Sequence, residues 1–205
     1  MMRRIFCFDL ETTGLPGWGR MIVPVQIAGL VLDAGREGLP AIAEFNRFLT
    51  IPAWAHIEAP AMAMHAAKGR TFEFFQNEGD LPSRVYTALH TFLMTHMGDG
   101  NKTMVAAGHN VAAFDLPILK YHWERCMGDS LPLPIDRHVL DTQIESTWAM
   151  MTGAALERVS LSATAAYWGV PLDPDEAHDA MTDTRVTAEV LRRQWAARVK
   201  NMGPT

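Results

Sequence analysis

The hydrophobic pattern of the chain opens with three strand-like segments. Residues 3–10 are almost continuously apolar and include Ile and Phe, which is typical of a strand buried on both faces. Residues 21–32 and 41–51 are predicted as two further strands, and the glycines and the proline within residues 35–40 predict a hairpin turn between them. The chain is therefore expected to begin as a β-meander.

The remainder of the chain alternates helical and strand-like patterns. Apolar residues recur at helical spacing in several segments, and prolines lie in or before the first turns of some of them. Helices are predicted at residues 61–67, 81–97, 115–127, 160–168 and within 178–199. Short apolar runs predict strands at residues 103–107 and 137–140. This order predicts an α/β domain built on a mixed sheet.

Length and composition favour one globular domain. The chain has 205 residues, of which 48% are hydrophobic and 20% charged, and we expect a single domain with its core at about residues 3–198. No apolar run reaches the roughly 20 residues that a membrane-spanning helix needs. The acids Asp9 and Glu11 interrupt any signal peptide, so a cytoplasmic location is expected. Two cysteines are too few for a disulfide framework or a zinc ribbon.

The charge balance restricts the nucleic-acid partners that the chain could bind. Lysine and arginine number 18 against 23 acidic residues, which gives a net charge of −5. A chain of this charge lacks the broad basic surface of a duplex-binding protein. It remains compatible with an enzyme that holds a few nucleotides and uses metal ions as its positive charge.

Two acids lie at the end of the first apolar run. Asp9 and Glu11 are two residues apart, so on a strand both carboxylates would project from the same face. Burying two like charges is unfavourable unless a cation or a shared proton compensates. The alternative is that the strand ends at Phe8 and the acids lie in a solvated loop. Residues 12–14 (Thr-Thr-Gly) then supply hydroxyls and backbone N–H groups for an anionic ligand, or they form an ordinary glycine turn.

Two further acids and a histidine are candidates for the same site. Asp115 lies near the start of a helix that follows a strand; alone it is best explained as a helix cap, although α/β sites also collect there. Asp183 shares a mostly apolar stripe of the last helix with Val186 and Val190. His178 would lie on another face of a regular helix, so it can act with Asp183 only if it precedes the helix.

Together these motifs resemble the DnaQ-like 3′→5′ exonucleases. Residues 8–15 (FDLETTGL) are similar to the first motif of that family, and residues 110–117 (NVAAFDLP) are similar to the second. Residues 178–183 (HDAMTD) match the third, His-x-Ala-x-x-Asp, which defines the DEDDh branch. The Asp-Thr pair at residues 141–142 is also common in this family. The resemblance extends over nearly the whole chain.

The resemblance implies a fold, a reaction and a set of roles. The fold would be ribonuclease-H-like, with a five-stranded mixed sheet and helices on both faces. The reaction would remove nucleoside monophosphates from 3′ ends with two Mg²⁺ or Mn²⁺ ions. Four carboxylates would bind the ions: those of Asp9, Glu11, Asp115 and Asp183. His178 would be the general base that accepts a proton. Carboxylate oxygens suit these hard cations, and an imidazole can accept a proton near neutral pH.

The resemblance also implies contacts with the substrate. Six residues are expected to make them: Thr12, Thr13, Leu15, His65, Asn110 and Phe114. Thr13 would approach the terminal 3′-hydroxyl, and Leu15 would wedge against the last base. His65 lies where many relatives carry His-Gly-Ile, but in this chain two alanines follow it. The loop at residues 16–24 contains Trp18 and either faces the substrate as a flap or packs on the domain.

Three functions are compared. The leading one is a 3′→5′ exonuclease that acts on single-stranded DNA or frayed 3′ ends and releases nucleoside 5′-monophosphates. The same chemistry on RNA, as in ribonuclease T-like or oligoribonuclease-like relatives, depends on a few contacts with the 2′-hydroxyl. A catalytically silent nucleic-acid adaptor is disfavoured, because all four acids and the histidine are present. A polymerase partner could bind only through a surface contact, since no C-terminal tether is expected.

Overall fold

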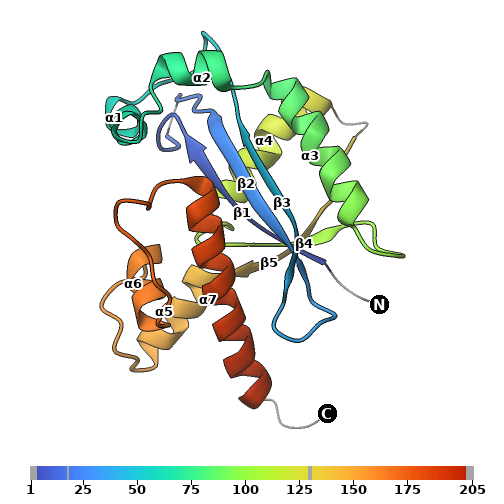
Figure 1. Ribbon diagram of the computed structural model, residues 1–205, viewed down its shortest axis with the longest axis vertical. Coiled ribbons are helices and arrows are strands. Elements are labelled where there is room, and N and C mark those ends of the chain that lie inside the picture. The colour runs from blue at the N-terminus through green and yellow to red at the C-terminus, as the bar shows by residue number, and fades with distance from the viewer. Residues whose placement is uncertain (1–3, 18, 129–130, 202–205) are drawn as a thin grey trace.

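A five-stranded mixed sheet forms the centre of the domain (Figure 1). The structure, a computed structural model, describes residues 4–17, 19–128 and 131–201. The strands are β1 (Arg4–Thr12), β2 (Pro24–Asp33), β3 (Ala41–Phe48), β4 (Met104–Gly108) and β5 (Ile135–Asp141). Their order in the sheet is β3-β2-β1-β4-β5. The pairs β1–β2 and β2–β3 are antiparallel, whereas β4 and β5 extend the sheet in parallel from β1.

Helices cover both faces of this sheet. The described part of the chain contains α1 (Ala59–Ala67), α2 (Phe72–Glu78), α3 (Pro82–His96), α4 (Asp115–Met127), α5 (Thr142–Met151), α6 (Leu161–Tyr167) and α7 (Ala180–Asn201). Helices α3 and α4 pack on one face and α7 on the other, with α5 and α6 beside α7 (Figure 1). The predicted five-stranded mixed sheet with helices on both faces is confirmed. None of the helices in the described ranges is long and apolar enough to cross a membrane.

The central strand β1 is buried on both faces, as its continuous apolar run predicts. Phe6, Phe8 and Leu10 pack on the side of α3 and α4, whereas Ile5 and Cys7 pack on the side of α7. The odd-numbered residues of β1 thus face α7 as far as the end of the apolar run. Any residue that continues this alternation meets the first turn of α7.

Several boundaries differ from the sequence prediction. Strand β1 continues two residues past its predicted end, because β2 runs alongside it and places Gln26 opposite Glu11. The alternative that Asp9 and Glu11 lie in a solvated loop is therefore wrong. The short helices α2 and α5 were not predicted, although each begins with a side-chain cap, from Thr71 and Asp141 respectively.

Candidate active site

Three carboxylates converge at the point where α7 meets the end of β1. Asp9 and Glu11 continue the odd-numbered face of β1, and Asp183 lies in the first turn of α7. One carboxylate oxygen from each of these acids lies within 4.8 Å of the other two. The cluster therefore arises from strand alternation on one side and from the packing of α7 on the other.

A fourth acid, Asp115, reaches the same strand from α4. It is the first residue of α4, which follows the parallel strand β4 next to β1. Its Oδ1 accepts a hydrogen bond of 3.0 Å from the backbone N–H of Leu10, between the two acids of β1. The N-cap position of α4 belongs to Phe114, which makes no side-chain cap. The interpretation of Asp115 as a simple helix cap is therefore wrong.

The electrostatics of this cluster are unfavourable without a cation. Burial raises the pKa of Glu11 to about 8, and repulsion from Asp183 adds to the effect. Burial likewise raises the pKa of Asp115 to about 7. The pKa of Asp9 is raised well above its usual value by burial and by the charges of Asp115 and Glu11, and burial also raises the pKa of Asp183. In the metal-free protein Glu11 would thus retain its proton at neutral pH, and each of the other three acids binds a proton more tightly than a free carboxyl does.

The donor atoms of the cluster fit a hard divalent cation. Oδ1 of Asp183 is buried and has no hydrogen-bond partner among the described residues. An unpaired buried carboxylate oxygen is unfavourable unless a proton or a cation compensates it. Carboxylate oxygens are the ligands that Mg²⁺ and Mn²⁺ prefer. The arrangement of Asp9, Glu11 and Asp183 therefore suits such an ion, with Asp115 beside them.

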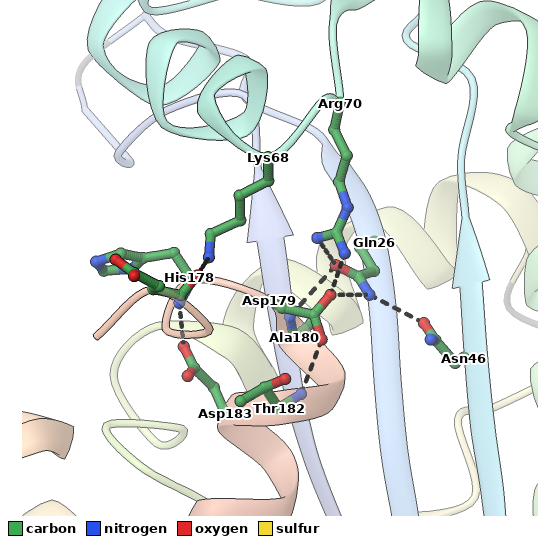
Figure 2. Close-up of polar contacts among 10 residues, drawn as sticks. Gln26, Asn46, Lys68, Arg70, His178, Asp179, Ala180, Thr182 and Asp183 are labelled. Atoms are coloured by element: carbon green, nitrogen blue, oxygen red, sulfur yellow. Dashed lines mark hydrogen bonds and ion pairs between the residues drawn. The ribbon is translucent and has the colours of Figure 1, made fainter. Parts of the chain in front are cut away.

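His178 lies in the turn immediately before α7. The helix begins at Ala180, so the condition under which the histidine could act with Asp183 is met. The backbone N–H of His178 donates a hydrogen bond of 3.2 Å to Oδ2 of Asp183 (Figure 2). Its φ angle of +63° is in the left-handed region, and its side chain is exposed. The turn thus ties the histidine backbone to the acid cluster and leaves the imidazole accessible.

The loop after β4 is held by an acid that we did not predict as a site residue. Asn110 has a φ of +61°, a conformation that asparagine tolerates better than most residues. Asp141 stabilises this loop, because Oδ1 accepts the N–H of Asn110 and Oδ2 accepts that of Ala112, both at 3.0 Å. The Asp-Thr pair in the sequence was the available signal for this role.

The comparisons with known proteins identify the family. A family model described as Exonuclease matches residues 6–191. The chain belongs to the exonuclease family. Membership in the DnaQ-like group, expected from the motifs, is thereby confirmed. A sequence comparison with curated proteins found no match.

Solved structures of exonuclease I share the fold of this exonuclease-family chain. The complex of Escherichia coli exonuclease I with a dT13 oligonucleotide is 16% identical, with a TM-score of 0.73 over 98% of this chain and 43% of that chain. Exonuclease I from Methylocaldum szegediense is 20% identical, with a TM-score of 0.73 over 97% of this chain and 41% of that chain. The chain thus spans less than half of these relatives, whose ribonuclease-H-like fold it shares.

Thr13, which the family resemblance predicts to contact the substrate, forms its hydrogen bonds within the protein. Thr13 is fully buried, and its hydroxyl donates to the carbonyl of His56 at 2.7 Å and accepts from the N–H of Val23 at 3.1 Å. Its own N–H donates to Val23 and its carbonyl accepts from Glu58. Thr13 therefore shapes the turn after β1, and its contact with a 3′-hydroxyl stays a prediction.

The other expected contacts differ in accessibility. The hydroxyl of Thr12 donates to the carbonyl of Gly14 at 2.7 Å, whereas Leu15 is 65% exposed and open to a ligand. His65 is only 1% exposed, and its Nε2 lies 3.0 Å from the carbonyl oxygen of Thr12. His65 thus supports the end of β1, and its contact with a nucleotide stays a prediction.

Phe114 lines a pocket whose walls include none of the four acids. This pocket has a volume of about 460 Å³ and lies between α4 and the loop that follows β1. Pro16, Met21 and Tyr121 also line it. Trp18, the aromatic residue expected in the flap, lies outside the described residues. Phe114 directly precedes Asp115 in the sequence, which is the connection of this pocket to the acids.

Proposed function

We propose that this exonuclease-family chain removes nucleoside 5′-monophosphates from the 3′ end of single-stranded DNA or from frayed 3′ ends. The convergence of Asp9, Glu11 and Asp183 within 4.8 Å carries this proposal. Four crowded acids beside an exposed histidine suit phosphodiester hydrolysis with two Mg²⁺ or Mn²⁺ ions. The family membership supports the same reaction.

Each residue of the cluster has a role in the proposed reaction. Asp9, Glu11, Asp115 and Asp183 would hold the two ions, which when bound stabilise charge on the attacking and leaving oxygens. The exposed imidazole of His178 accepts the proton of the attacking water. The backbone hydrogen bond from His178 to Asp183 keeps this base beside the carboxylates. Asp115 also fixes β1 next to the cluster through the N–H of Leu10.

Three observations support single-stranded DNA as the substrate. The net charge of −5 gives no broad basic surface for a duplex, so a short contact near bound cations is favoured. The pocket lined by Phe114 and Tyr121 offers aromatic faces on which a base could stack. Exonuclease I structures with a dT13 oligonucleotide and with single-stranded DNA share the fold. We therefore propose that the terminal nucleotides lie between the exposed Leu15 and this pocket.

A panel of substrates tests the function directly. Single-stranded DNA, single-stranded RNA and blunt duplexes of one sequence, labelled at the 5′ end or, in parallel, within the 3′-terminal nucleotide, would be incubated with Mg²⁺, Mn²⁺ or EDTA. We expect a ladder that shortens from the 3′ end of single-stranded DNA with either metal, mononucleotides as products and no reaction in EDTA. Asp9→Asn should be inactive, whereas Asp80→Asn, an exposed aspartate outside the cluster, should behave as wild type.

The panel also separates the competing functions. Faster shortening of RNA than of DNA would assign the chain to RNA processing. Binding of single strands without any cleavage would indicate an adaptor. Cleavage that continues in EDTA would contradict the metal-dependent mechanism.

A further inference from the structure

The turn that carries His178 is held by the connection between α1 and α2. No described residue forms a hydrogen bond with the imidazole of His178, so the position of the ring depends on its backbone. Two basic residues after α1 contact the chain on either side of the histidine, Lys68 through a backbone carbonyl and Arg70 through a side chain (Figure 2). The Nζ of Lys68 donates to the carbonyl of Asp175 at 2.8 Å, three residues before it. Arg70 forms an ion pair with Asp179, the residue directly after it.

Asp179 joins this ion pair to the start of α7. Its Oδ1 accepts the N–H of Thr182 at 2.8 Å, which caps the first turn of the helix. Its Oδ2 accepts hydrogen bonds from Arg70 and, at 3.2 Å, from Nε2 of Gln26. The single carboxylate therefore fixes the residue after His178 to both the helix and the sheet.

Gln26 completes the connection to the sheet. It is fully buried in β2, opposite Glu11 in the register of the two strands. Its Oε1 accepts from the N–H of Ala180 at 3.3 Å and from Nη1 of Arg70 at 3.2 Å. Arg70 thus contacts Asp179 and Gln26 at once, which the planar guanidinium can do and a lysine ammonium matches poorly. The guanidinium also lies over the ring of Phe48, 5.0 Å from its centroid.

The contacts converge on one residue of the proposed mechanism. Arg70 and Lys68 hold the chain on both sides of His178, and neither forms a hydrogen bond or ion pair with an acid of the cluster. A group that transfers a proton must be held within a fraction of an ångström, and a misplacement of about 1 Å can slow a reaction about 10²-fold.

We propose that Arg70, acting through Asp179, positions His178 for proton transfer and that Lys68 is a second tether of the same turn. The inference rests on the proposed function, because it assigns a role in that reaction. Arg70 is a positioning residue: it acts on the base and not on the substrate. The α1–α2 connection is therefore part of the active site although it lies far from the three motifs in the sequence.

Single-turnover cleavage of single-stranded DNA by four variants tests the inference. Arg70→Met should slow cleavage about 10- to 100-fold while DNA affinity and the metal-induced rise in melting temperature stay near wild type. Arg70→Lys should recover part of the rate, and Asp179→Asn, which can still cap α7, should resemble Arg70→Met. Arg185→Met is the matched control, because it breaks an exposed ion pair from α7 to Glu44 and should keep the wild-type rate.

A double variant separates positioning from general stability. In the His178→Ala background, Arg70→Met should slow cleavage by less than about threefold, since the base that it positions is absent. If Arg70→Met reduced the cleavage rate equally in both backgrounds, the inference would be overturned. It would also be overturned if Arg70→Met and Asp179→Asn cleaved at the wild-type rate while His178→Ala cleaved slowly. Those results would leave the proposed function intact. Absence of 3′-end cleavage by the wild type would instead contradict the function itself and the inference with it.

Discussion

Replacing Glu11 by glutamine should stabilise the metal-free protein at alkaline pH. Glu11 is only 8% exposed, and the pKa of its carboxyl is raised from the usual 4.5 to about 8 by burial and by repulsion from Asp183. The folded protein therefore keeps a proton that the unfolded chain loses above about pH 4.5. Because the folded state binds more protons, its stability falls as the pH rises from about 4.5 to about 8. Glutamine keeps the shape of the side chain and removes this loss.

The difference between the folded and unfolded pKa values of Glu11 determines how much stability the wild type loses. At about 1.4 kcal/mol for each pKa unit, the loss in the free energy of unfolding is at most about 5 kcal/mol at pH 8 and above. Water entry and rearrangement of the crowded acids reduce this figure, so we expect roughly 2 kcal/mol or more. For a domain of this size, about 1 kcal/mol shifts the melting temperature by 2–4 °C. Glu11→Gln should therefore melt at least about 4 °C higher than wild type at pH 8.5 in EDTA.

Thermal melts in EDTA at pH 5.0 to 9.0 measure this difference. Burial lowers the pKa of His65, His109 and His122, but these rings are present in both proteins, so the difference between the two melting temperatures isolates Glu11. The advantage of Glu11→Gln should grow with pH and shrink when Mg²⁺ or Mn²⁺ is added, since the ion stabilises the wild-type cluster. Glu37→Gln, in the exposed turn after β2, is the control and should match wild type throughout.

A lower melting temperature for Glu11→Gln in EDTA at pH 8.5 would refute this reasoning. It would mean that Glu11 stabilises the metal-free fold, for example as a hydrogen-bonded structural acid. An advantage that does not change between pH 5.0 and 9.0 would also refute it, because the proposed cause is the loss of a proton.

Three further outcomes are expected. Mg²⁺ or Mn²⁺ should raise the melting temperature of the wild type. The same ions should hardly change the melting temperature of Asp9→Asn, and this variant should not cleave. Full activity of Asp9→Asn in EDTA would exclude the metal site. A 3′-phosphate should slow release of mononucleotides strongly, whereas equal cutting of circular single strands would indicate an endonuclease. His178→Ala should cleave about 10²–10⁴-fold more slowly with its metal response retained; a normal rate with a lowered melting temperature would make His178 structural.

The sequence predicts the parts of the site that depend on local periodicity. Strand alternation places Asp9 and Glu11 on one face, and the structure has them there. The spacing of His178 and Asp183 requires the histidine to precede the helix, and α7 indeed begins after it. In each case the geometry follows from the chain within a few residues, so the residue pattern alone suffices.

The remainder depends on contacts between distant segments. The extension of β1 to Thr12 arises because β2 pairs with it, which no pattern within β1 shows. Helices α2 and α5 are short and lack a clear apolar stripe, so only their caps indicated them. Arg70 and Asp179 are 109 positions apart in the sequence, and from the sequence each would be predicted to be an ordinary charged surface residue.

The backbone of His178 explains why such distant contacts belong to the site. A φ of +63° is unfavourable for a residue with a side chain, and such conformations persist where the surroundings impose them. Here the left-handed turn directs the N–H of His178 to Asp183 and leaves the imidazole exposed. Lys68 and Arg70 hold the chain before and after this turn, so they supply the constraint that the conformation needs. In the proposed mechanism, the motif defines which histidine acts as the base, and the α1–α2 connection holds the chain on both sides of it.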